Sequence, residues 1–163
     1  MGKINLVRVD DRLIHGQVMT KWSKGLGTNA IYVIDNETAA DDFMKDIYIN
    51  ANSSSGLKIR VYSTKEVIDE WNKDQFGNDT VVLLFKNIAS VKEVVENGLP
   101  VQALNVGGVS KKGNAQFVIP TVALTETDVE NLKAIEAKGI EIFFQTVPDS
   151  ARKSFADALK AIK

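Results

Sequence analysis

Short apolar runs alternate along the whole chain with amphipathic stretches. Some runs, such as residues 81–85, are apolar at every position, which is typical of strands buried on both faces of a parallel sheet. Between the runs, apolar residues recur at the spacing of one helix face. The pattern predicts strands at residues 4–9, 30–34, 59–62, 80–85, 101–106, 117–119 and 140–144.

Two of the predicted helices have readable starting points. Ser63 with Glu66, and Thr125 with Asp128, have the spacing of a capping box ahead of an apolar stripe. Glycines near residues 98 and 139 end two helices before the next strand. Further helices are predicted over residues 16–24, 41–51, 87–97 and 149–162.

This alternation of strand and helix predicts the fold class. We expect an α/β protein, a single doubly wound domain over residues 1–163. Its central sheet would be mostly parallel, with about seven strands and helices on both faces. The glycine-rich residues 107–113 interrupt the alternation, so strand 117–119 is expected at an antiparallel edge or in a hairpin.

Composition narrows the function classes. The 163 residues include 20 Lys and Arg against 21 Asp and Glu, so the formal charge of −1 gives no electrostatic case for nucleic acid. The chain has no cysteine, which excludes disulfides and thiolate catalysis and suits a reducing cytosol. No apolar stretch approaches the length of a membrane span, so we expect no direct membrane insertion.

Two glycine patterns match nucleotide-binding motifs in spacing but lack the flanking elements or residues that such motifs require. Residues 25–30 match G-x-G-x-x-A, but they follow a predicted helix and precede a strand, the reverse of a dinucleotide site. Residues 108–113 have P-loop spacing, but Asn114 and Ala115 replace the required Lys and Ser/Thr. One histidine and no cysteine give few metal ligands. We therefore expect neither a cofactor nor a metal.

The strongest chemical candidate is His15, the only histidine in the chain. It follows the first strand and directly precedes a predicted helix that begins with Gly16 and Gln17. The free amides of a helix start suit a phosphate. Arg12 offers a planar fork of donors to phosphoryl oxygens, and Asp10 can orient the imidazole or the loop. These parts are what phosphoryl transfer to a histidine requires.

Residue types alone leave other interpretations open. His15 can be a cap or surface residue, and Arg12 with Asp10 or Asp11 can be a surface ion pair of little energetic consequence. Asp10 and Asp11 can instead form a magnesium-dependent aspartate phosphoacceptor. A third interpretation is a non-catalytic regulatory binding domain on the same fold.

Other residues are candidates for the rim of this site. Asn105, Gly107 and Gly108 follow or end a central strand, where the glycines either border the site or form a tight turn. Arg8, together with Arg12, Lys21 and Lys24, either meets an acidic partner or belongs to a solvated face.

Polar residues also follow two further predicted strands. Lys86 and Asn87 follow one strand, and Asn87 is expected to cap the next helix rather than bind phosphate. Asp35 and Asn36 follow another strand and either face the same cleft or cap a helix.

Residues 8–18, Arg-Val-Asp-Asp-Arg-Leu-Ile-His-Gly-Gln-Val, resemble the motif of the enzyme IIB components of the mannose/fructose/sorbose family of the sugar phosphotransferase system. Trp22 and residues 85–87 and 104–108 extend the resemblance, which covers the whole chain. In that family the motif histidine carries the phosphoryl group, which implies phosphorylation of His15, with Nδ1 favoured by analogy.

The resemblance also implies partners. A IIA domain would donate the phosphoryl group, and the IIC and IID membrane subunits would present the sugar that receives it. The sugar would be of the mannose, fructose, sorbose or N-acetylgalactosamine class. The protein would be a phosphotransferase component in the cytoplasm, associated peripherally with the membrane permease complex.

Overall fold

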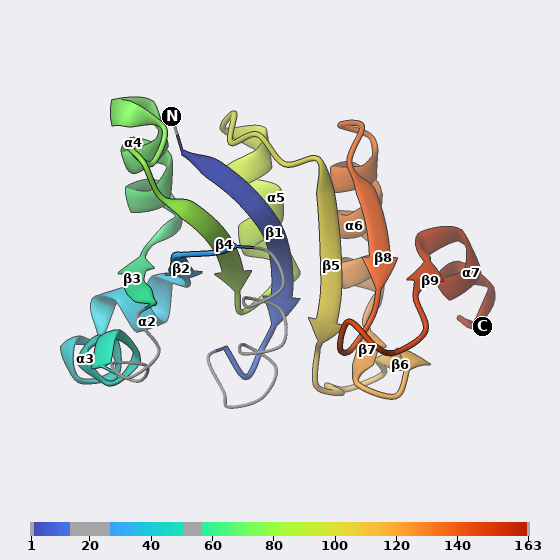
Figure 1. Ribbon diagram of the computed structural model, residues 1–163. Coiled ribbons are helices and arrows are strands. Elements are labelled where there is room, and N and C mark those ends of the chain that lie inside the picture. The colour runs from blue at the N-terminus through green and yellow to red at the C-terminus, as the bar shows by residue number, and fades with distance from the viewer. Residues whose placement is uncertain (1, 14–26, 51–56, 163) are drawn as a thin grey trace.

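The computed structural model describes residues 2–13, 27–50 and 57–162. Their main feature is a seven-stranded sheet with the strand order β3-β2-β4-β1-β5-β8-β9 (Figure 1). All its neighbouring pairs are parallel except β8 with β9. The strands are β1 (Lys3–Asp10), β2 (Ala30–Ile34), β3 (Lys58–Tyr62), β4 (Thr80–Phe85), β5 (Ala103–Gly108), β8 (Glu141–Phe144) and β9 (Lys153–Ser154).

The central strands are buried on both faces, as their continuous apolar runs predict. All five residues of β2 are buried, and so are residues 81–85 of β4. Alternate residues of β4 enter two separate cores: Leu83 faces one cluster and Leu84 the other. The predicted doubly wound α/β class is confirmed.

The helices among residues 2–13, 27–50 and 57–162 lie on both faces of the sheet. In Figure 1, α4 (Thr64–Asp74), α5 (Ile88–Glu96) and α6 (Glu126–Glu136) line up behind the sheet, and their apolar residues form the larger core. The smaller α7 (Phe155–Lys160) adds Phe155 and Ala158 to it. On the other face, α2 (Asn36–Ala40) and α3 (Asp42–Asn50) pack Ala39 and Tyr48 against the second core.

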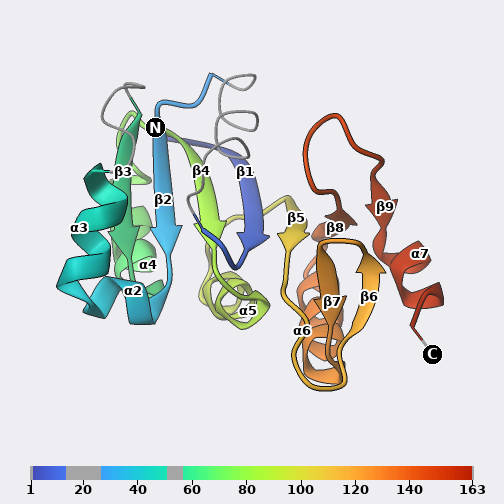
Figure 2. The same ribbon diagram turned by 90° about the horizontal axis from the view of Figure 1, so that it is seen from below.

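The glycine-rich interruption leads into a hairpin. β6 (Gln116–Ile119) pairs antiparallel with β7 (Val122–Leu124) in a separate two-stranded sheet, seen from below in Figure 2. The hairpin alternative for residues 117–119 is thus confirmed, whereas β7 itself was not predicted. The seventh strand of the main sheet is β9 instead.

Two helix predictions need correction. The helix predicted over residues 149–162 begins only at Phe155, because residues 153–154 pair with β8 and Ser154 caps the helix by accepting the amide of Asp157 at 3.1 Å. The short α2 was missed, and its N-cap is Asp35, which accepts the amide of Thr38 at 3.1 Å. The helix predicted over residues 16–24 lies outside the described residues.

Other helix starts agree with the sequence. The capping boxes at Ser63 and Thr125 are both formed, and Asn87 caps α5 by accepting the amide of Ser90 at 2.9 Å. Within the described residues, no helix is long and apolar enough to cross a bilayer.

The cap of α6 gives a stability prediction. Thr125→Ala removes the acceptor of the Asp128 amide, which lies 3.0 Å from the hydroxyl, and should lower the free energy of unfolding by about 1 kcal/mol. Thr127→Ala, at an exposed position in the first turn of the same helix, is the matched control. Urea unfolding of both variants measures the difference, and equal losses would show that the cap contributes nothing.

Candidate functional site

The candidate site lies where β1 and β5 end side by side. The next strand of the main sheet after β1 is β2, which lies on one side of the β1–β5 pair; the next one after β5 is β8, which lies on the other side. Such a divergence at the carboxyl ends of parallel strands is where open α/β sheets bind ligands. Asp10, the last residue of β1, is the register partner of Gly108, the last residue of β5.

The carboxylate of Asp10 organises the chain that follows β1. Its Oδ1 accepts the backbone amide of Arg12 at 3.1 Å and the side-chain Nε of Arg12 at 3.0 Å. Its Oδ2 accepts Nη2 of Arg12 at 2.9 Å. Both ends of the carboxylate thus hold one planar guanidinium, the geometry of a bidentate pair. The prediction that Asp10 organises the loop agrees with this geometry.

Arg12 combines a fixed position with access to solvent. Asp10 is fully buried, whereas the side chain of Arg12 is 46% exposed. Asp10 uses Nε and Nη2, and no described residue accepts a hydrogen bond from Nη1 of Arg12. The guanidinium is therefore held along one edge while donors on its other edge face outward, as a phosphate-binding arginine requires.

Arg8 is buried beneath the site, although a charged residue of this kind is expected at the surface. It is fully buried and donates Nη2 to Asp10 Oδ2 at 3.2 Å and Nη1 to Asn105 Oδ1. The same guanidinium reaches the chain after β8, with Nη1 3.1 Å from the carbonyl of Gln145 and Nη2 2.8 Å from that of Thr146. The interpretation of Arg8 as a partner-facing surface residue is wrong, since its donors face inward.

The proposed rim residues therefore lie beneath the site. Asn105 is fully buried, accepts from Arg8 and donates Nδ2 to the carbonyl of Gln145 at 3.2 Å. Gly107 and Gly108 belong to β5 and form no tight turn. A Cβ on Gly107 would overlap the guanidinium of Arg8, and one on Gly108 would lie 2.6 Å from Asp10 Oδ1. The two glycines make room for buried charges rather than border the site.

The charges perturb one another in defined directions. Burial alone would raise the pKa of Asp10, but hydrogen bonds from Arg12 and the positive charges of Arg8 and Arg12 bring the pKa below its usual value. The pKa of Arg12 is raised by its hydrogen bonds to Asp10. Burial lowers the pKa of Arg8. Because Arg8 is buried, the positive charge that an anion can reach is that of the half-exposed Arg12, whose pKa the charge of Asp11 also raises.

The loop after Asp10 is tied to β5 and is strained. Asp11 donates its amide to the carbonyl of Gly108 at 2.9 Å and accepts the amide of Ser110 at 2.7 Å. Leu13 is buried with φ of 56°, a left-handed conformation that is unfavourable for a leucine. Its amide donates to the carbonyl of Asp10 at 2.9 Å, which closes a turn. His15, Gly16 and Gln17, the centre of the predicted site, lie outside the described residues.

A polar hollow of about 340 Å³ lies beside this loop. Its walls include Asp11, Lys86 and Lys112, together with Glu37 from α2. The predicted polar edge at Lys86 therefore faces a cavity next to the site. Asp35 and Asn87 also line it, but their side chains cap α2 and α5, as the capping alternative predicts.

The structure weakens the alternative that uses a metal. Both oxygens of Asp10 are occupied by arginine donors, and one oxygen of Asp11 accepts the Ser110 amide. Magnesium coordination by Asp10 would require breaking the buried ion pairs. Among the described residues, no group of three or more His, Asp or Glu side chains could hold a metal ion.

The residue pattern does not indicate that the chain after β8 contacts the candidate site. Gln145 and Thr146 reach the buried cluster through their backbone carbonyls, and the hydroxyl of Thr146 lies 2.9 Å from that of Thr121. Thr121 donates in turn to the carbonyl of Gly107 at 2.8 Å. A backbone carbonyl leaves no signal in residue type, so only the fold can reveal these contacts.

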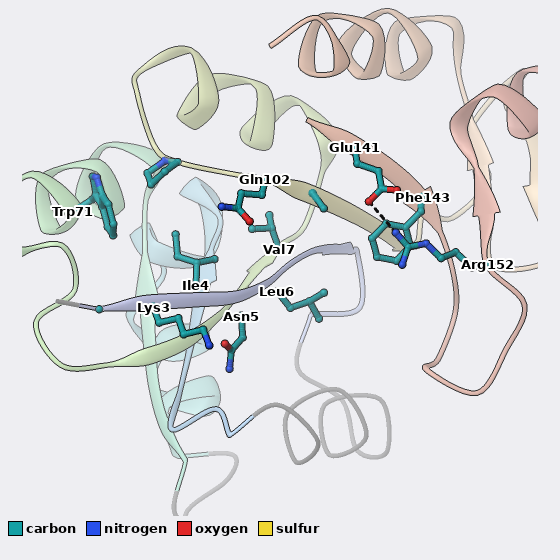
Figure 3. Close-up of a pocket in the computed structure, with 13 residues that line it drawn as sticks. Lys3, Ile4, Asn5, Leu6, Val7, Trp71, Gln102, Glu141, Phe143 and Arg152 are labelled. Atoms are coloured by element: carbon teal, nitrogen blue, oxygen red, sulfur yellow. Dashed lines mark hydrogen bonds and ion pairs between the residues drawn. The ribbon is translucent and has the colours of Figure 1, made fainter. Parts of the chain in front are cut away.

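A second hollow, of about 550 Å³, lies at the opposite end of the strands (Figure 3). Residues at the beginnings of β1, β5 and β8 line it. Arg152 stacks at 3.6 Å over the ring of Phe143 and forms an ion pair with Glu141 at 3.0 Å. Because it is remote from the carboxyl ends of the strands, this hollow is no part of the candidate site.

Comparison with known proteins agrees with the geometry. The family model described as "PTS system sorbose subfamily IIB component" matches residues 4–163. The chain is similar to the "PTS system mannose-specific EIIAB component" of Escherichia coli K12, with 33% identity over 159 residues and 98% of this chain covered. It spans 49% of that relative, about half of its length.

Two further relatives match over most of their own length. The "PTS system sorbose-specific EIIB component" of Lacticaseibacillus casei is 33% identical over 144 residues, which cover 88% of this chain and 87% of that protein. The crystal structure of manxB from Thermoanaerobacter tengcongensis superposes with a TM-score of 0.91 at 38% identity, covering 99% of this chain and 98% of the other.

The packing of Gly107 against Arg8 gives a second prediction. Gly107→Ala should lower the free energy of unfolding by about 3 kcal/mol, because the new methyl group forces the buried guanidinium away from its acceptors. Gly113→Ala, at an open position with φ of 52°, should cost only about 1 kcal/mol.

Urea unfolding of a double-mutant cycle tests the cause. In the background of Arg8→Ala, the further change Gly107→Ala should cost much less, since the clashing group is absent. Additive losses would contradict the assigned clash.

Proposed function

The chain belongs to the sorbose subfamily of IIB components of the phosphotransferase system, and we propose that it carries a phosphoryl group on His15. The observation that best supports this is the preorganised pair of Asp10 and Arg12 at the carboxyl end of β1. It presents outward-facing donors three residues before the only histidine of the chain.

The proposed reaction is a pair of phosphoryl transfers. In the first, the bond between phosphorus and the histidine nitrogen of phospho-IIA breaks as a ring nitrogen of His15 bonds to phosphorus. In the second, that new bond breaks as a sugar hydroxyl oxygen bonds to phosphorus, and the hydroxyl proton is lost. Arg12 binds equatorial phosphoryl oxygens, while Asp10 holds Arg12 in place. Gly16 and Gln17 contribute amides.

A carrier must release what it binds. Donors that stabilised phospho-His15 as strongly as the transition state would not speed onward transfer. Asp10 neutralises part of the charge of Arg12 and occupies two of its nitrogens, so the remaining interaction with phosphate is moderate. Buried Arg8 donates to Oδ2 of Asp10 at 3.2 Å and so helps to fix the carboxylate that holds Arg12.

The proposed partners follow from the family. A IIA domain donates the phosphoryl group, and IIC and IID membrane subunits present the sugar; a IIA activity accompanies IIB in the EIIAB relative by its name. We place the protein in the cytoplasm, at the inner face of the permease. The sugar class comprises mannose, fructose, sorbose and N-acetylgalactosamine, to which relatives are specific by name.

Phosphorylation of His15 is directly measurable by intact mass. The chain is incubated with phosphoenolpyruvate, enzyme I, the phosphocarrier protein and a cognate IIA, alongside His15→Ala. We expect one added phosphoryl group on the wild type and none on the variant, because the nucleophile is lost.

Acid treatment of the same samples identifies the bond. A phosphohistidine is labile in acid, so brief acid treatment should restore the unmodified mass. No phosphorylation by a competent phospho-IIA would favour a non-catalytic binding domain, and an adduct that survives acid or the variant would place the phosphoryl group on another residue.

The role of Arg12 gives a separate prediction. Arg12→Ala should slow phosphorylation by phospho-IIA on the order of 100-fold, through loss of a charged donor to the transferring group. The matched control is Arg152→Ala, whose side chain is 50% exposed and also ion-paired, but with Glu141 of β8 instead of a residue of the candidate site. Rapid-quench kinetics give both rates. Equal rates for the two variants would remove Arg12 from the mechanism.

A further inference from the structure

Helix α3 (Asp42–Asn50) packs Tyr48 against the second core but leaves Phe43 and Ile47 exposed. None of its nine residues is buried, whereas α5, of the same length, buries Ile88, Val91 and Val94 among others. Phe43 is 73% exposed and Ile47 is 45% exposed. Residues four apart lie on one face of a helix, so the two side chains form a continuous apolar stripe.

Exposed acidic residues precede Phe43 and Ile47 in the sequence of α2 and α3. Glu37, Asp41, Asp42 and Asp46 are all exposed, and Lys45 is the one basic residue between Asn36 and Asn50. None of these four carboxylates forms an ion pair with a described residue. The surface formed by α2 and α3 therefore combines an apolar centre with an acidic rim, the layout of a protein interface.

The acidic surface is continuous with the candidate site. In Figure 1, α2 and α3 lie at the lower end of the sheet, where β1 also ends. Glu37 of α2 lines the same hollow as Asp11, which belongs to the loop after β1. A partner that reaches this loop can therefore contact α3 at the same time.

We propose that this acidic–apolar surface docks on the cytoplasmic loops of the membrane subunits that receive the phosphoryl group. Short cytoplasmic loops of membrane proteins are enriched in Lys and Arg. They therefore match the rim in charge, and the exposed Phe43 and Ile47 are available to apolar side chains of the same surface. The proposal rests on the proposed function, and it names the surface by which the carrier finds its acceptor.

The charge of the rim disfavours two other occupants. A second copy of the chain, bound through the same patch about a two-fold axis, would set the carboxylates of both copies against one another. A bare bilayer carries anionic lipids on its cytoplasmic leaflet and would repel the same carboxylates. A basic protein surface has neither disadvantage.

Sugar phosphorylation by membrane vesicles containing the cognate IIC and IID subunits tests the surface. We compare the wild type with Phe43→Ser/Ile47→Ser and with Asp42→Lys/Asp46→Lys, and we use Phe117→Ser as the control, since Phe117 is 52% exposed on the separate hairpin. Circular dichroism and thermal unfolding verify that each variant folds; the α3 residues are unburied, so we expect little change.

For both α3 variants we expect at least a tenfold rise in the KM for the carrier with kcat unchanged. Phosphorylation by phospho-IIA in solution should match the wild type, and the control should match it in both assays. The wild-type KM should also rise with salt concentration, because exposed charges contribute to the encounter.

Three results would overturn the proposal. The first is half-saturation of the α3 variants at the wild-type concentration. The second is a loss in phosphorylation by phospho-IIA, which would assign the surface to the donor. The third is binding of the wild type to subunit-free lipid vesicles, or its dimerisation in sedimentation, through this surface. Absence of phosphate on His15 in the wild type would instead contradict the proposed function. Intact mass measures that phosphorylation independently of the KM for the carrier.

Discussion

The buried carboxylate of Asp10 is the interaction on which the candidate site depends. It accepts Arg12 on the solvent side and Arg8 on the inner side, so one group fixes both the exposed donor and its internal support. Removing one partner from a buried ion pair costs far more than the pair contributes, because the remaining charge is left desolvated. Arg8 and Asp10 therefore form a buried unit in which the loss of either leaves the other charge unpaired, whereas the half-exposed Arg12 depends on Asp10 for its position.

This unit imposes constraints on distant parts of the chain. Gly107 and Gly108 have no side chain where Arg8 and Asp10 need space, and Asn105 supplies a buried acceptor two residues earlier. The carbonyls of Gln145 and Thr146 satisfy further donors of Arg8. The ends of β1, β5 and β8 are thereby joined beneath the loop that leads to His15, which gives a phosphoryl carrier a rigid base.

The loop after β1 and the helices α2 and α3 lie at the same end of the sheet but differ in charge. Chemistry is concentrated near the diverging ends of β1 and β5, where Arg12 is held. Charge of the opposite sign is concentrated on α2 and α3, and Glu37 of α2 lines the hollow beside the loop after β1.

The sequence by itself determined the α/β class, the central strands, the capped helices and, through the motif from Arg8 to Val18, the family. Those features are local: strand burial, capping and motif order are expressed in residues that are near one another in the chain. It did not determine that Arg8 and Asn105 are buried partners, that Gly107 and Gly108 make space for charges, or that β9 replaces the start of a predicted helix. Only the tertiary structure decided these points, because each depends on a contact between segments far apart in sequence, and residue type alone does not reveal which atom lies opposite.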